Sequence, residues 1–396
     1  MLSEGAARSN RQSLLGSRFA LQRARHRADT HTMRTLWPNC ARLAALAAAV
    51  LALGTDSAHA WGLLGHRIVA ETAALLMREH EHGHWGRFLA RHRFELGYYS
   101  AVPDHTWRHT DGAKGETEGP THFFDIDLVA KDAKGAANLP VDYREFVKFA
   151  ESNQDSRAHG AEKIGSSPWR VEQFTRLIRK TVASKSAPDA AIAFQGGYQS
   201  GSRATGSNQA LYETVPLLGE LSHYTGDATM PYHSVKDYNG WAIGQGGIHF
   251  YLESDCVDAL EPGIAPRVRD LALKMRREWT AQWGLDSSAL VRSFQRVAWE
   301  SATQTKRAAA LDRKHALLER SRPEDEATMR FAKRRPAAQG CVGMKDFLIE
   351  RLARGAVVTE FFWRAALPAG ADFSRGEHIL FNDIVNVPAY IAPDYR

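Results

Sequence analysis

The 396-residue chain has only three cysteines, and no apolar run after residue 60 is long enough to form a transmembrane helix. It also lacks the G-x-S-x-G turn of serine hydrolases, because Ser200 lies in G-x-x-S-G instead. No stretch shows sustained alternation of apolar and polar residues, and no internal repeat is present. The sequence therefore argues against a serine hydrolase, a sheet-based fold and a transmembrane helix beyond residue 60.

The N-terminal region has the pattern of a secretory signal peptide at residues 33–60. Arg34 and Arg42 precede the apolar run 43–53, and Ala58-His59-Ala60 supplies the small residues of a cleavage site. Residues 1–32 show no foldable pattern, so we interpret them as an upstream extension before a start at Met33. Cleavage after Ala60 would make Trp61 the first residue of an exported protein, either periplasmic or secreted.

Most of the net charge of +6 belongs to this N-terminal region. Residues 1–60 hold eight arginines and three acidic residues, which leaves 43 basic and 42 acidic residues from position 61 onward. The exported part is therefore close to neutral and encodes no long-range field that would attract polyanions. Cys40 lies in the signal peptide. Cys256 and Cys341 could pair in an oxidising compartment or stay free, and the sequence leaves both outcomes open.

Apolar residues recur with a helical period over most of residues 61–368, which predicts an all-α fold with a single multi-helix domain. The clearest helices are expected at 211–227, 271–283, 289–302 and 347–367. Residues 195–208 have the composition of a Gly/Ser-rich connector, and 320–340 that of a charged, proline-broken surface insertion. Residues 369–396 are expected to form a C-terminal extension that packs on the domain.

Two histidine–acid pairs indicate metal binding. His223 and Asp227 are four residues apart on a predicted helix, so both side chains leave the same face, and His249 and Glu253 repeat the spacing. Imidazole nitrogens and carboxylate oxygens bind zinc at roughly 2.0–2.2 Å. One such pair is more often a solvated helix pair. Two pairs within 31 residues, with His233 between them, predict clustered metal ions.

These residues resemble the motifs of the zinc-dependent phospholipase C and S1/P1 nuclease superfamily. The motifs occur in the family's order, from Trp61 to Glu253: W-G-x-x-G-H, a lone Asp104, T-H-F-F-D, H-Y-x-G-D-x-x-x-P-x-H and H-x-x-x-E. The resemblance implies an all-α fold with three zinc ions in a cleft. It also implies one ligand set for each ion: Asp104, His122, His223 and Asp227; His233, His249 and Glu253; and Trp61, through its α-amine and carbonyl, with His66 and Asp227.

The resemblance further implies a zinc-dependent phosphoric ester hydrolase that uses a metal-activated water, with Asp104 orienting or deprotonating that water. Glu253 and the short interval between His233 and His249 are typical of the phospholipase C branch, so we expect phospholipid headgroups as substrates. The alternative is a nuclease acting on single-stranded DNA or RNA, because Phe123 and Asp125 occupy the positions where nucleases stack and hydrogen-bond a base.

Three points stay open in the sequence. Phe123 could be a core residue as well as a substrate contact. A non-catalytic zinc-binding exported protein is a third hypothesis, although a ligand set with an open coordination position argues against it. The oligomeric state is not encoded, and our expectation is a monomer.

Overall fold

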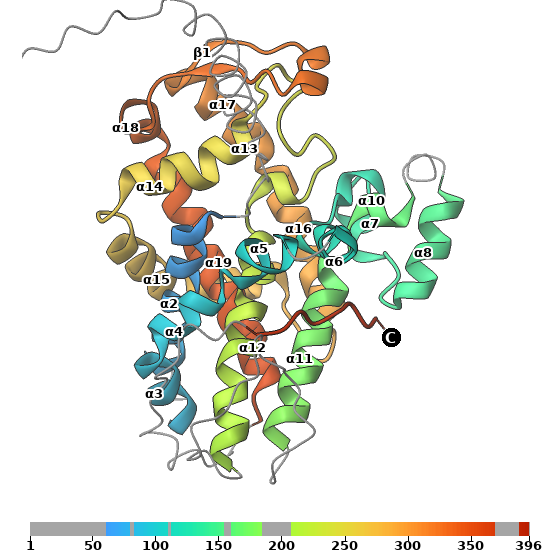
Figure 1. Cartoon of the computed structure of the whole chain (residues 1–396), viewed down its shortest axis with the longest axis vertical. Coiled ribbons are helices and arrows are strands. Elements are labelled where there is room, and N and C mark those ends of the chain that lie inside the picture. Colours follow the sequence, from blue (N-terminus) through green and yellow to red (C-terminus); the bar gives the residue numbers. More distant parts are fainter. Residues whose placement is uncertain are drawn as a thin grey trace, which may run out of the picture. The chain divides into compact units, whose positions relative to one another are not determined.

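The computed structural model describes residues 61–79, 83–109, 112–153, 160–183, 207–368 and 388–395 (Figure 1). The predicted signal peptide and upstream extension lie outside the described residues. Within them, helices dominate and the only strands are β1 (Leu317–Glu319) and β2 (Lys333–Arg334), which pair antiparallel. The predicted all-α fold is confirmed. No helix in the described part of the chain has the length and apolarity needed to cross a membrane.

The described residues contain helices of two kinds: seven long ones that build the body and many short ones that connect them. The long helices are α2 (Leu63–Glu79), α11 (Ser167–Ala183), α12 (Ser207–Asp227), α15 (Ala265–Trp283), α16 (Leu290–Thr303), α17 (Thr305–His315) and α19 (Lys345–Ala366). The short ones are α3 (Gly83–Arg91), α4 (Arg93–Tyr99), α5 (Val102–His105), η1 (Trp107–His109), α6 (Gly112–Glu118), η2 (Gly119–His122), η3 (Ile126–Leu128), α7 (Ala133–Ala137), α8 (Tyr143–Ser152), α10 (Ala161–Ile164), η4 (Pro231–His233), α13 (Ile248–Phe250), η5 (Tyr251–Asp255), α14 (Cys256–Leu260), η6 (Pro323–Thr328), α18 (Ala337–Gly340) and η7 (Cys341–Met344).

Helix α19 forms the centre of the body. Seventeen of its 22 residues are buried, as expected for a helix that is covered on all sides, and it packs against α2, α12 and α15. Gly355 allows the close approach of α2, because a Cβ there would lie 3.1 Å from Val69 and 2.9 Å from the Thr229 hydroxyl. The buried carboxylate of Glu360 accepts a hydrogen bond from Arg276 at 2.9 Å, so its charge is compensated inside the core.

A disulfide joins Cys256 at the start of α14 to Cys341 at the start of η7. Of the two outcomes that the sequence left open, the structure shows the paired one. The expected surface insertion at 320–340 contains η6, β2 and α18, and β2 pairs with β1 just before the insertion. The sequence did not predict this hairpin, because strands of three and two residues are too short to show a period-two pattern.

The C-terminal segment 388–395 lies along η1 and α11 and is drawn in dark red in Figure 1. The indole of Trp107 donates to the carbonyl of Pro388 at 3.0 Å, and Gln173 donates to that of Ala392 at 2.8 Å. The hydroxyls of Ser166 and Tyr395 are 2.8 Å apart. These bonds attach the segment to the helical body. The rest of the predicted extension, residues 369–387 and 396, lies outside the described part.

Candidate metal centre

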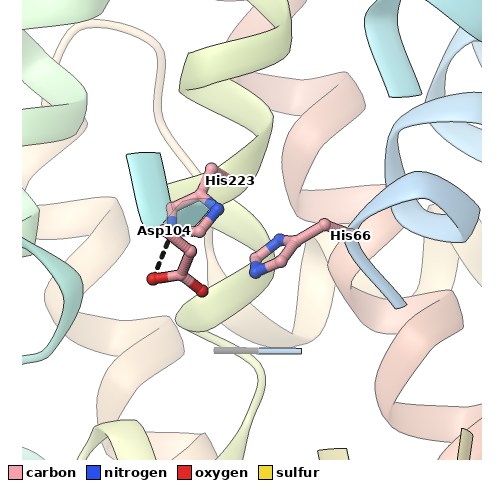
Figure 2. A group of neighbouring side chains, drawn as sticks. All are labelled: His66, Asp104 and His223. Atoms are coloured by element: carbon pink, nitrogen blue, oxygen red, sulfur yellow. Dashed lines mark ion pairs between the residues drawn. The ribbon is translucent and has the colours of Figure 1, made fainter. Parts of the chain in front are cut away.

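Three elements that are distant in sequence meet at the N-terminal part of α2. His66 comes from α2, Asp104 from α5 and His223 from α12, and their side chains converge in Figure 2. The His66 and His223 rings stack with their centroids 4.0 Å apart, and Asp104 Oδ1 lies 3.8 Å from His223 Nε2. All three residues are buried, and their donor atoms lie within 4.8 Å of one another. The geometry suits a shared cation.

A second group continues from the first through His223. His122 Nδ1 lies 2.8 Å from His223 Nε2, and Asp227 Oδ2 lies 3.5 Å and 3.4 Å from these two nitrogens. Asp104 Oδ1 is also 3.4 Å from His122 Nδ1. Two ligands of a tetrahedral zinc with bonds of roughly 2.0–2.1 Å are about 3.3 Å apart. The structure thus brings together the four residues that the resemblance assigned to one zinc, with most separations near that value.

The third group lies on the loop and helices after α12. His249 Nε2 is 2.8 Å and His233 Nε2 is 3.6 Å from the same Glu253 oxygen, and all three side chains are buried. Glu253 belongs to η5, which is a π-helical turn, a distortion that is often found at functional sites. The histidine–acid pair predicted on a regular helix therefore lies where α13 passes into a wider turn.

Trp61 is fully buried beside the first two groups. Its indole N–H donates to the carbonyl of Gly226 at 2.9 Å, which anchors it next to Asp227. His66 Nε2 lies 3.3 Å from Asp227 Oδ1, and the carbonyl oxygen of Trp61 accepts the backbone N–H of His66 at 3.1 Å. The three residues assigned to the third zinc are therefore neighbours. One lone pair of the Trp61 carbonyl is already used.

Most donor atoms of these groups are buried polar atoms that make no well-oriented hydrogen bond to another described residue. Burying such atoms is costly unless something compensates them. They are His66 Nδ1 and Nε2, Asp104 Oδ2, Asp227 Oδ1 and Oδ2, His233 Nε2, His249 Nε2, and both carboxylate oxygens of Glu253. This set of imidazole nitrogens and carboxylate oxygens fits zinc, and divalent cations would satisfy it.

Backbone carbonyls fix two of the imidazole rings. The Nδ1–H of His223 donates to the carbonyl of Ser100 at 2.8 Å, and that of His233 to the carbonyl of His122 at 2.9 Å. Each bond places the ring proton on Nδ1, so the lone pair of Nε2 faces the other metal-binding side chains of its group. Such supporting hydrogen bonds are typical of histidines that bind metal.

A buried carboxylate supports the remaining ring of the second group. Glu118 Oε1 lies 3.3 Å from His122 Nε2 and accepts hydrogen bonds from Tyr224 at 2.6 Å and Thr121 at 3.0 Å. Its other oxygen accepts from the buried guanidinium of Arg170 at 2.9 Å. Glu118 was not among the predicted site residues, although it stands four residues before His122 and so repeats the spacing of the other histidine–acid pairs.

Burial sets the pKa values of most donor groups. It lowers the pKa of His66 and of His249 to about 3, so both rings are neutral and carry a free lone pair at neutral pH. It raises the pKa of Asp227 to about 7 and that of Glu253 to about 8. Burial would also lower the pKa of His122, but the adjacent carboxylates of Asp227 and Glu118 raise it to about 9. A metal that binds here must displace protons.

The two residues predicted to contact substrate flank the buried core. Phe123 is half-buried, whereas its neighbour Phe124 is fully buried against Phe146 and Trp169. Asp125 is buried, its Oδ1 has no hydrogen-bond partner in the described chain, and burial raises its pKa well above the usual range. Phe124 is thus a core residue, and Phe123 is the member of the pair with a partly accessible ring.

Comparisons with known proteins identify no family for this chain. No protein-family model matches it, and neither does any curated protein. Among solved structures, the alpha-toxin of Clostridium perfringens from avian strain SWCP matches with 14% sequence identity and a TM-score of 0.32. The match covers 76% of this chain and 64% of the toxin chain. Support for the fold class and for the metal centre therefore comes from the helices and side chains of this chain.

Proposed function

We propose that the chain is an exported zinc-dependent phosphodiesterase of the phospholipase C type, with three zinc ions held by Trp61 and the three donor groups. The observation that carries the proposal is the convergence of eight buried histidine, aspartate and glutamate side chains at separations that suit zinc. Bound zinc supplies positive charge for a phosphoester and activates water near neutral pH. The disulfide supports export, because such bonds persist in oxidising compartments.

Asp104 is the residue that we propose to act on the attacking water. Its Oδ1 accepts a hydrogen bond from Arg108 at 3.2 Å, while Oδ2 has no partner in the described structure. Burial would raise the pKa of Asp104, but the neighbouring His223 and His122 hold it well below its usual range. The carboxylate is therefore ionised, and Oδ2 can orient a water molecule and accept its proton.

The supporting residues keep the donors in place during a reaction. Glu118 contacts the Nε2 side of the His122 ring, and the carbonyl of Ser100 fixes the tautomer of His223. Because the bond to Ser100 and the 3.3 Å contact with Glu118 are both buried, neither ring needs to reorganise when a phosphoester binds. Preorganisation of this kind is a major contribution to catalysis in enclosed sites.

The proposed substrate is a phospholipid, and the support for this choice is the H-x-x-x-E ending of the third group at Glu253. A nuclease remains the second candidate, because the half-buried ring of Phe123 stands two residues before a buried carboxylate at Asp125 that lacks a partner for Oδ1. A base could stack on the ring and donate to that oxygen.

The test is a parallel assay of the chain beginning at Trp61 on phosphatidylcholine, phosphatidylglycerol, single-stranded DNA and RNA. We expect phospholipid hydrolysis that EDTA abolishes and added zinc restores. His249→Asn should lower the zinc content and the rate, whereas His315→Asn on α17, outside the donor groups, should leave both unchanged. Nuclease activity alone would reverse the substrate assignment. Bound zinc with no turnover of any substrate would favour a zinc-binding protein without catalysis.

A further inference from the structure

Exposed apolar side chains are unevenly distributed over the described surface. Of the eleven large hydrophobic residues that are exposed there, six lie on two segments, 238–250 and 318–331, which we call the rim segments. The six are Tyr238, Ile243, Phe250, Leu318, Met329 and Phe331, each between 37% and 53% exposed. Single exposed apolar residues are normal, but a concentration of them on adjoining segments marks an interaction surface.

The rim segments are joined into one unit. The backbone N–H of Ser321 donates to the carbonyl of Gly244 at 3.2 Å, and the Trp241 and Phe331 rings stack with centroids 5.5 Å apart. Gly247 has a φ of +86°, and a Cβ there would lie 3.0 Å from the Phe331 ring. Since this glycine is the N-cap of α13, the insertion packs directly against the start of the helix that carries His249.

The same unit borders the third donor group. The carboxamide of Asn239 accepts the backbone N–H of His249 at 3.3 Å, and the exposed ring of Tyr238 lies with its centroid 6.2 Å from the His249 ring. Phe250, which is 44% exposed, is the next residue after His249. A surface that docks through the rim segments would therefore lie beside the metal centre.

Cationic side chains accompany the apolar ones. A hollow on the insertion is lined by Arg320, Arg322, Arg330 and Lys333, together with Phe331, Ser321 and two acidic residues. One of these acids, Asp325, is already paired with Arg322 at 3.1 Å. The lining thus has an excess of positive charge, although the chain from residue 61 onward is nearly neutral.

We infer that the rim segments dock on a lipid membrane surface that carries anionic headgroups, and this inference rests on the proposed phospholipase function. Aliphatic side chains such as Leu318, Ile243 and Met329 gain by entering the acyl region, whereas nucleic-acid bases stack on aromatic rings. Arginine and lysine side chains are attracted to anionic headgroups at the same interface. The mixture of aliphatic, aromatic and cationic residues therefore favours a membrane over a single-stranded nucleic acid.

The test is cosedimentation of the zinc-stripped chain with vesicles, so that binding is measured without turnover. The parent should bind phosphatidylcholine vesicles containing phosphatidylglycerol more tightly than pure phosphatidylcholine vesicles, and the difference should shrink as salt is raised. The double variant Leu318→Glu, Met329→Glu should bind at least about tenfold more weakly. The matched variant Phe94→Glu, Val141→Glu, which changes exposed residues outside the rim segments, should bind like the parent.

Circular dichroism and melting temperature show whether each variant is folded. Equal binding by the parent and the rim variant would overturn the inference, as would binding of a single-stranded oligonucleotide in preference to vesicles. Hydrolysis of a water-soluble phosphodiester by the zinc-loaded parent tests the proposed function separately. A chain that hydrolyses this substrate but ignores vesicles would refute the docking surface alone, and one that binds vesicles without hydrolysis would refute the enzymatic proposal alone.

Discussion

Glutamine in place of Glu118 removes one negative charge from behind the metal centre with almost no change in shape. In the native chain, Glu118 accepts hydrogen bonds from Tyr224, Thr121 and Arg170 and lies 3.3 Å from His122 Nε2. A glutamine can offer only one acceptor oxygen to these donors. It also removes the carboxylate that pairs with the fully buried guanidinium of Arg170 at 2.9 Å.

Two effects of Glu118→Gln follow, and they are measured separately. Loss of the partner of a metal-binding histidine typically lowers metal affinity by about 10–100-fold, and we expect this loss for zinc. Breaking a buried ion pair on one side costs about 3–5 kcal/mol of unfolding free energy. Competition with a chromophoric chelator gives the zinc affinity, and urea denaturation of the zinc-free chain gives the stability.

Tyr224→Phe is the matched control for this prediction. It removes a single hydrogen bond to Glu118, at a cost of about 1 kcal/mol, but keeps the carboxylate charge beside His122 and Arg170. Zinc affinity should therefore stay near that of the parent. If Glu118→Gln binds zinc as tightly as the parent while still losing stability, the carboxylate serves the fold only, and its proposed support of His122 is wrong.

The remaining predictions concern the donors themselves. Asp104→Asn should keep the fold and lower turnover by at least about 10²-fold, the scale of general-base catalysis, and near-parent kcat would show that Asp104 has another role. A chain with one extra residue before Trp61 should lose one zinc by metal analysis and most of its activity, because an acylated nitrogen cannot bind metal; retention of both would contradict the terminal ligand. Apparent zinc affinity should rise with pH through neutrality, by about tenfold per pH unit for each proton released, because the pKa of His122 is about 9 in the metal-free chain. Titrations at several pH values that give one affinity would contradict this protonation state.

Local spacing explains how much of the site could be predicted from the sequence. His223 with Asp227 and His249 with Glu253 are four residues apart, so a helical turn alone places the partners of each pair together. The helical period likewise predicted α12, α15, α16 and α19, and α19 was expected at 347–367 where the structure has Lys345–Ala366. These features can be predicted because they depend only on residues that are close to one another in the sequence.

Other features depend on contacts between distant segments. Ser100 supports His223 from 123 residues away, and Arg170 reaches Glu118 across 52 residues, so no local pattern marks either residue. The π-helical turn at Glu253 was also missed, because its apolar spacing over five residues does not differ from that of an ordinary helix. Glu118 itself could have been found, since it precedes His122 by the same four residues.

We propose that the donor groups around His223 and Glu253, together with Trp61, hold three zinc ions. Anomalous diffraction at the zinc absorption edge, from crystals of the chain that begins at Trp61, tests it most directly. Three anomalous peaks are expected, one of them bonded to the terminal nitrogen of Trp61. Refined density with no anomalous peak at these groups, or with zinc bound only elsewhere on the chain, would contradict it.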